Sequence, residues 1–148
     1  MSLEFPKESI LGHAHTLRRG GVTYDVYKLI DLAKDVPVTT EKVAKLNNIG
    51  LEDLCWTDLN EIRFSPGELL EAYRKSGSLE SLAINHPEFG VHIKRIRKAD
   101  YSHPILMFEG DVIDGMHRLV KAIIDSVEFI PVKTITELPT QAIYNKLD

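Results

Sequence analysis

The stretch that most constrains the fold is ILMFEGDVIDGMHRLVKAII, which begins at residue 105. Two short segments, Ile105 to Phe108 and Asp111 to Ile113, flank Glu109-Gly110, a pair typical of a tight turn between antiparallel strands. Asp114-Gly115 then separates the second strand from Met116 to Asp125, where apolar residues recur at helical spacing. This stretch predicts a β-hairpin that passes through a glycine directly into a helix.

Other patterns predict further elements around this unit. Strands are expected at Val22 to Tyr24, in the ambiguous segment PVTTEKVAKL that starts at Pro37, and at Phe129 to Ile135. Helices are expected after Asp25, after Ser65, after Pro87, and from Leu138 to Lys146. Between residues 47 and 64 the chain is irregular, and Cys55 and Trp56 are its main apolar anchors. Because strands and helices do not alternate strictly, the pattern predicts an α+β fold.

Length and composition suit one globular domain. The chain has 148 residues, of which 43% are hydrophobic and 27% charged. The first twenty residues lack periodicity, so we expect an N-terminal arm over residues 1–20 and a single domain over 21–148. There is no apolar core of a signal peptide and no apolar run long enough for a membrane span. The chain has a single cysteine, Cys55, so no internal disulfide can form. Together these features predict a cytoplasmic protein.

The net charge of -4 argues against a protein that coats nucleic acid, since such domains are usually strongly basic. One basic cluster, KRIRK from Lys94 to Lys98, falls on the helix expected after Pro87. The apolar residues Phe89, Ile93 and Ile96 share one face of that helix. The cluster contains no aromatic residue that could stack on a base. A solvated helix face is therefore the favoured interpretation, and nucleic-acid binding is the alternative.

The residues DGMHR, from Asp114 to Arg118, combine groups that suit a bound phosphate. The first N–H groups of a helix have no partners within it, and the helix dipole places roughly half a positive charge there. Gly115 allows an anion to approach the backbone, and His117 and Arg118 add donors. A simpler interpretation also fits, in which Asp114 only caps the helix and the two basic side chains are solvated. Neither a P-loop nor a dinucleotide-binding glycine motif occurs.

The run HPILMFEGDVIDGMHRLVKAI resembles the ParB/sulfiredoxin superfamily, whose members carry a strand-turn-strand-helix unit with a Gly-x-His-Arg or Gly-x-Arg-Arg signature at the helix start. The resemblance extends from Tyr101 to Lys133 and, in outline, to YDVYKLIDLAKDVPV and RFSPGELLEAY upstream. It implies a ParB/sulfiredoxin-like fold, a small mixed sheet with surrounding helices. It also implies a site for a nucleoside di- or triphosphate (ATP, ADP or CTP), with Mg²⁺ recruited partly through the phosphates.

The same resemblance implies roles for individual residues. Four residues would form the phosphate-binding turn: Gly115, Met116, His117 and Arg118. Asp114 would orient this turn or help to place a metal ion, and Arg63 would be a further cofactor-binding residue. An upstream acid, Glu61 or Asp58, would supply the carboxylate for phosphoryl transfer. The expected catalytic residues are thus Asp114, His117 and Glu61, and no metal site made of protein side chains alone is expected.

Two departures restrict the activity that the resemblance implies. Sulfiredoxin needs a cysteine between the glycine and the histidine of the signature, and Met116 stands there, so reduction of a peroxiredoxin sulfinate is not expected. Chromosome-partitioning ParB continues into a helix-turn-helix domain and a dimerisation tail, whereas only a short tail follows the last expected strand here. Centromere sliding is therefore not expected either.

These features predict a nucleotide-binding domain, with phosphoryl transfer to a small-molecule acceptor or nucleotide hydrolysis as the reaction class. One alternative is a DNA-associated ParB-like accessory or nuclease-like protein that uses the cations of the basic cluster. Another is an interaction module without catalysis. The sequence does not specify the base, the acceptor or the oligomeric state.

Overall fold

A four-stranded mixed sheet organises the chain, with strand order β3-β8-β6-β7. The computed structural model describes residues 16–47, 51, 56–57, 60 and 62–144. The strands of the main sheet are β3 (Thr39–Lys42), β6 (Ile105–Phe108), β7 (Asp111–Asp114) and β8 (Phe129–Ile135). β6 pairs antiparallel with β7 and parallel with β8, and the outer strand β3 pairs antiparallel with β8. The predicted α+β class is confirmed.

Two smaller strand pairs and six α-helices complete the described part of the chain. The additional strands are β1 (Thr16–Arg19), β2 (Val22–Asp25), β4 (Trp56–Thr57) and β5 (Arg63–Phe64). The helices are α1 (Val26–Leu32), α2 (Val43–Leu46), α3 (Pro66–Ser76), α4 (Leu79–Asn85), α5 (Gly90–Lys98) and α6 (Met116–Ile124), with 3-10 turns η1 (Pro87–Phe89) and η2 (Thr140–Ala142). None of these described helices combines the length and apolarity needed to cross a bilayer.

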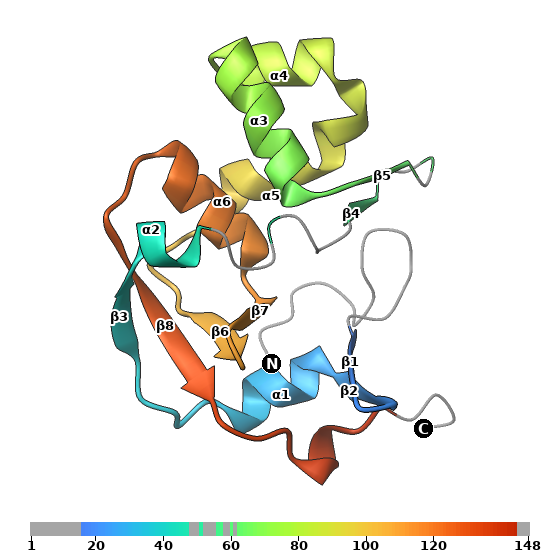
Figure 1. Cartoon of the computed structure of the whole chain (residues 1–148), viewed down its shortest axis with the longest axis vertical. Coiled ribbons are helices and arrows are strands. Elements are labelled where there is room, and N and C mark those ends of the chain that lie inside the picture. The colour runs from blue at the N-terminus through green and yellow to red at the C-terminus, as the bar shows by residue number, and fades with distance from the viewer. Residues whose placement is uncertain (1–15, 48–50, 52–55, 58–59, 61, 145–148) are drawn as a thin grey trace.

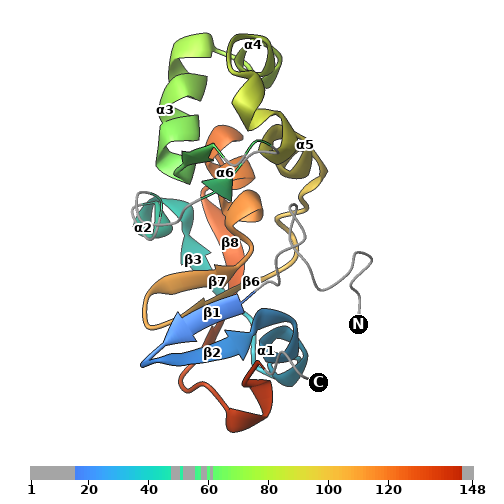
Figure 2. The same ribbon diagram turned by 90° about the vertical axis from the view of Figure 1, so that its right-hand side faces the viewer.

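One end of the molecule is formed by helices. Figures 1 and 2 show α3, α4 and α5 gathered at that end, α1 and the β1-β2 pair at the other, and α6 between them beside the sheet. The chain passes from β7 through α6 to β8, so the helix expected after the hairpin connects an edge strand to an inner strand. The N-terminus of α6 therefore lies at the edge strand β7 of the main sheet, on the side toward α3, α4 and α5.

Strand β6 separates two hydrophobic clusters. Ile105 and Met107 face the larger cluster, which includes the fully buried Leu119 of α6, whereas Leu106 and Phe108 face a smaller cluster built on α1. Successive side chains of a strand point to opposite faces, so a strand covered on both faces needs a continuous apolar run. The sequence ILMF meets that need, and all four residues are buried.

Capping residues begin two helices where the sequence predicts them. The Asp25 carboxylate accepts hydrogen bonds from the backbone N–H of Tyr27 at 2.9 Å and of Lys28 at 3.4 Å. Ser65 Oγ accepts from the N–H of Glu68 at 3.1 Å, with Pro66 in the first turn of α3. In each case a side-chain oxygen satisfies an N–H that the helix itself leaves without a partner.

Some elements differ from expectation. Thr16–Arg19, expected within the N-terminal arm, form β1, which pairs with β2 and whose Arg19 bonds Asp111 on the β6-β7 hairpin. The ambiguous segment after Pro37 holds both a strand, β3, and a short helix, α2. Helix α4 is an additional element, and it begins where Ser78 Oγ accepts from the N–H of Ser81 at 3.1 Å.

The predicted C-terminal helix from Leu138 to Lys146 is wrong over the residues that the structure describes. Only the 3-10 turn η2 forms there, preceded by Pro139. Ile143 forms an isolated bridge with Tyr24, and the N–H of Tyr144 donates to the Thr23 carbonyl at 2.8 Å. Pairing with β2 takes the backbone groups that a helix would have used.

Candidate phosphate site at the β7-α6 junction

The junction between β7 and α6 is shaped by an irregular register and a glycine. Leu106 pairs with Asp114 and Met107 with Val112, so the β6-β7 register shifts just before the junction. Such irregularities re-aim the side chains that follow them. Gly115 has a φ of +105°, and a Cβ there would lie 2.5 Å from Cγ2 of Ile105. A glycine is therefore required at this position both by the backbone angle and by the close packing on β6. The local sequence pattern does not reveal the close packing on β6.

Gly115 is the N-cap residue of α6, and no side chain caps the helix. The simpler interpretation, in which Asp114 only caps the helix, is wrong, because its carboxylate accepts a hydrogen bond from Arg118, at 2.6 Å. The N–H of Leu119 reaches the Gly115 carbonyl at 3.0 Å, so the N–H groups of Met116, His117 and Arg118 form the positive end of the helix dipole.

Arg118 is held from two sides. One guanidinium nitrogen donates to Asp114 and the other donates to the Pro104 carbonyl at 2.7 Å. The side chains of Arg118 and Asp114 are only 20% and 23% exposed, which limits solvent screening of their ion pair. A guanidinium has more N–H donors than these two bonds use. The cation is thus fixed at the start of the helix with donors remaining.

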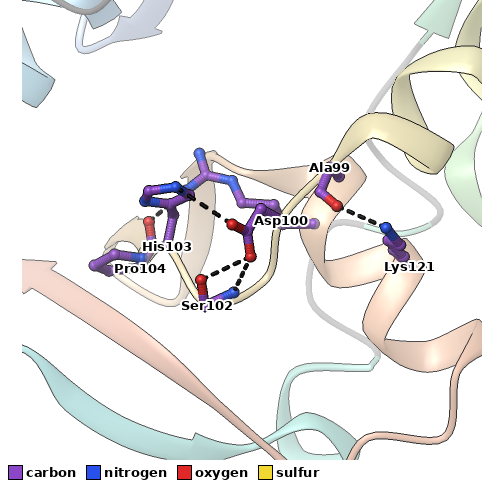
Figure 3. A network of polar contacts seen from close by, with 7 residues as sticks. Ala99, Asp100, Ser102, His103, Pro104 and Lys121 are labelled. Carbon is purple, nitrogen blue, oxygen red and sulfur yellow. Dashed lines mark hydrogen bonds and ion pairs between the residues drawn. The ribbon is translucent and has the colours of Figure 1, made fainter.

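The connection between α5 and β6, which contains Pro104, has polar contacts of its own, as Figure 3 shows. Asp100 accepts from the Ser102 N–H at 3.0 Å and from Ser102 Oγ at 2.7 Å, and His103 Nε2 lies 3.6 Å from the same carboxylate. The hydrogen bonds from Ser102 lower the pKa of the Asp100 carboxyl. Lys121 Nζ donates to the Ala99 carbonyl at 2.8 Å, so α6 is also tied to the end of α5.

His117 contacts a second histidine that sequence reasoning did not single out. Nδ1 of His92, on α5, lies 2.9 Å from Nε2 of His117, and Nε2 of His92 lies 2.8 Å from the carbonyl oxygen of Thr57. His92 is 3% exposed, between the core residues Phe89 and Ile96 of the same helical stretch. The available signal was a histidine on an otherwise apolar helix face.

Both imidazoles lie flat against Trp56. The centroid of the Trp56 ring is 4.5 Å from that of His92 and 4.4 Å from that of His117, with 6° between the planes in each case. Phe64 meets His92 edge-on at 5.4 Å and 88°. Trp56 and Phe64 are buried, as residues of the hydrophobic core are. The stacking on Trp56 holds the two imidazole rings nearly parallel, with 4° between their planes.

The other predicted site residues are dispersed. Arg63, exposed on β5, pairs in register with Thr57, the residue whose carbonyl bonds His92. Met116 is buried in the larger hydrophobic cluster, so only its backbone N–H is suited to contact a phosphate. Glu61 and Asp58 lie outside the described residues. No group of three or more His, Cys, Asp or Glu suited to a metal ion occurs within the described part of the chain.

The basic cluster on α5 is mostly a solvated surface. Lys94, Arg97 and Lys98 are exposed, and the last two lie in the final turn, where cations stabilise the helix dipole. Arg95 differs from them, because partial burial lowers the pKa of its guanidinium and Tyr27 opposes that shift. The cluster therefore does not present one continuous row of cations.

Comparison of the chain with protein-family models, curated proteins and solved structures found no match. A functional assignment consequently depends on the residues of the junction: an uncapped helix start, a fixed arginine and a stacked pair of histidines.

Proposed function

We propose that the β7-α6 junction binds the phosphates of a nucleoside di- or triphosphate. The observation that carries the proposal is the start of α6, which lacks a side-chain cap and holds Arg118 in place through Asp114 and Pro104. A helix N-terminus with a fixed arginine offers an anion both backbone N–H donors and a charge-assisted partner. The resemblance of DGMHR to the ParB/sulfiredoxin signature supports the same assignment.

The geometry favours binding because its main donor is already ordered. Immobilising a long side chain on binding costs about 0.5–1.5 kcal/mol, and the two hydrogen bonds of Arg118 remove much of that cost. The Asp114 carboxylate is engaged with Arg118, which suits it to orient the arginine more than to act as a base or a metal ligand. Mg²⁺ would accompany the nucleotide, with phosphate oxygens and water as most of its ligands.

The other site residues have distinct roles in the proposal. His117 is the second side chain of the phosphate-binding turn, and Met116 contributes its backbone N–H. Arg63, which pairs in register with Thr57, is a further candidate cation. Phosphoryl transfer to a small acceptor, or nucleotide hydrolysis, is the reaction class that such a site would serve. Glu61 is the candidate carboxylate for that step.

The first test is a thermal-shift screen of the full chain with ATP, ADP, CTP and GTP, with and without Mg²⁺. A ligand that binds only the folded state raises the melting temperature, by RT ln(1 + [L]/Kd) in free energy. We expect at least one nucleotide to raise it, and the parent nucleoside to leave it unchanged. No shift with any nucleotide would favour an interaction module without a ligand.

The second test replaces Arg118 by alanine and uses Lys121→Ala as the matched control. Both side chains tie α6 to backbone carbonyls near the α5-β6 connection, but Lys121 lies one turn further from the helix start. We expect Arg118→Ala to weaken nucleotide binding by about 1.5–3 kcal/mol, which is at least tenfold in Kd. Lys121→Ala should retain the wild-type Kd by calorimetry. Equal affinities for Arg118→Ala and wild type would contradict the proposal.

The alternative of DNA association through the basic cluster predicts a different pattern of losses. Replacing Lys94, Arg97 and Lys98 together by glutamine should leave nucleotide binding unchanged, because none of them belongs to the junction. Salt-dependent DNA binding that disappears in this variant but survives in Arg118→Ala would support this alternative over the proposed site.

A further inference from the structure

We propose that the end of β8 is a docking site, at which an extended peptide segment of a partner protein adds a strand to the main sheet. Two neighbouring features point to it, the backbone of Thr134 and an apolar groove beside that residue. The inference is independent of the proposed phosphate site, which lies at the start of α6.

Strand β3 covers only the first part of β8. The pairing ends with Thr39 opposite Val132, whereas β8 continues to Ile135. On the opposite side of β8, β6 pairs as far as Ile135. Figure 1 shows β8 extending past β3 toward α1. Residues 133–135, which we call the open edge of β8, therefore have a neighbour on one side only among the described strands.

The backbone groups of Thr134 point toward the open edge. Oγ1 of Thr39 donates to the Val132 carbonyl at 3.3 Å, and the N–H of Val43 donates to the Glu128 carbonyl at 2.9 Å, so these even-numbered residues face β3. Because the backbone groups of successive residues in a strand point to opposite sides, the N–H and C=O of Thr134 face the same side, beyond the end of β3. Within the described part of the chain neither group has a hydrogen-bond partner, and Thr134 is exposed.

The sequence explains why β3 stops where it does. If the antiparallel register continued for two more residues, Pro37 would lie opposite Thr134. Proline has no N–H to donate to the Thr134 carbonyl, and it is disfavoured inside a paired strand. A strand from another molecule has no such restriction. In an antiparallel arrangement, one residue of that strand would satisfy both the N–H and the C=O of Thr134.

A groove of about 370 Å³ lies beside the open edge. It is lined by Thr134 and Ile135 of β8, and by Leu29, Leu32 and Val36 of α1 and the turn that follows it. This volume falls within the range of about 300–1,000 Å³ that is typical of ligand sites. An unpaired strand edge next to an apolar groove is the arrangement that binds peptides by strand addition, since the backbone supplies affinity and the groove supplies specificity.

Strand alternation specifies the side chains that the partner segment needs. Ile135 packs against the smaller hydrophobic cluster, which is built on α1, so the partner residue next to the one opposite Thr134 points to that side. There an apolar side chain would cover Leu32, which is 46% exposed. Glu137 is the one charged residue in the described lining of the groove, and it favours a cation near one end of the segment. The partner segment therefore combines an apolar residue between polar ones with a lysine or arginine.

Hydrogen exchange and amide NMR of the full chain with the peptide acetyl-Lys-Thr-Leu-Thr-amide test the docking. In the free protein we expect the N–H of Thr134 to exchange much faster than that of Val132, which faces β3. The peptide should slow exchange at Thr134 and leave Val132 unchanged. The same peptide with its leucine and second threonine N-methylated should bind at least about tenfold more weakly, because it lacks the N–H groups that pair with a strand.

Leu32→Gln tests the groove, with Ile84→Gln as the matched control. Both side chains are exposed on helices, 46% and 79% respectively, so both variants should fold as the wild type does. Ile84 lies on α4, at the end of the molecule opposite to α1. We expect Leu32→Gln to weaken binding of the peptide by about fivefold or more, and Ile84→Gln to retain the wild-type Kd.

Several outcomes would overturn the proposal. Equal affinities for the plain and the N-methylated peptide would show that no strand is added, and equal affinities for Leu32→Gln and wild type would exclude the groove. Absence of binding at millimolar peptide would also contradict it. Protection of the Thr134 amide that appears without peptide and increases with protein concentration would instead identify a second copy of this chain as the occupant.

Discussion

At the scale of single residues, the junction depends on a few side chains whose neighbours decide their roles. Gly115 could be assigned to a turn from the sequence, but its contact with Ile105 could not, since it depends on how β6 pairs with β7. His92 was missed because its partners, His117 and Thr57, are 25 and 35 positions away along the chain. Local patterns identify the residues of a motif, whereas long-range pairing decides what they contact.

Gly115→Ala should destabilise the protein by about 2–5 kcal/mol, the sum of the costs of the positive φ and of the clash with Ile105. Gly110→Ala is the matched control, because Gly110 has a φ of +82° but open space where the alanine Cβ would lie. The control should lose only about 1–2 kcal/mol in urea unfolding. Equal losses for the two variants would show that the contact with Ile105 carries no cost.

The Asp100 carboxylate predicts a specific dependence of stability on pH. In the folded state the pKa of this carboxyl is lowered from 3.8, chiefly by the hydrogen bonds from Ser102. The carboxylate therefore stabilises the fold above pH 3.8, and this stabilisation is lost as the pH falls through the pKa of the folded state. The melting temperatures of wild type and Asp100→Asn should therefore draw closer together as the pH is lowered from 6 to below 3.8. A constant difference over that range would contradict this role of Asp100.

At the scale of elements, helix caps explain where the predicted and observed helices agree, and pairing with distant segments explains where the predictions are wrong. Asp25 and Ser65 begin α1 and α3 as their sequence patterns predict. The short strand β1 carries little apolar alternation, and it forms because β2 and Asp111 pair with it. The C-terminal helix fails for the related reason that β2 binds Ile143 and Tyr144. Short elements are thus decided by partners that no local pattern reveals.

Lys133 predicts a measurable connection between β8 and α1. Its Nζ donates to the carbonyls of Ala33 at 3.1 Å and Lys34 at 3.0 Å, the two residues that directly follow α1, where a cation also favours the helix dipole. Lys133→Met keeps the apolar stem and should cost about 1–2 kcal/mol of unfolding free energy. Lys34→Met, an exposed position, should change it by less than about 0.5 kcal/mol. Comparable losses would show that the two bonds contribute nothing.

At the scale of the whole molecule, one central strand links the candidate site to both hydrophobic clusters. Ile105 of β6 belongs to the larger cluster together with residues of α6, and Leu106 belongs to the smaller cluster together with residues of α1, so the start of α6 lies beside a strand that is buried on both faces. The order β6, β7, α6 and β8 was predictable from hydrophobic pattern and turn residues. The pairing of β3 with β8, and the packing of β4 and β5 near α5, depend on contacts distant in sequence.

The central claim is that phosphates bind at the start of α6. Its most direct test is a backbone amide NMR titration of the full chain with ADP and Mg²⁺, with adenosine as the control. We predict that ADP, but not adenosine, produces its largest shifts at the amides of Met116, His117 and Arg118. ADP shifts centred elsewhere, for example on α1 and η2, or equal shifts with adenosine, would contradict the claim.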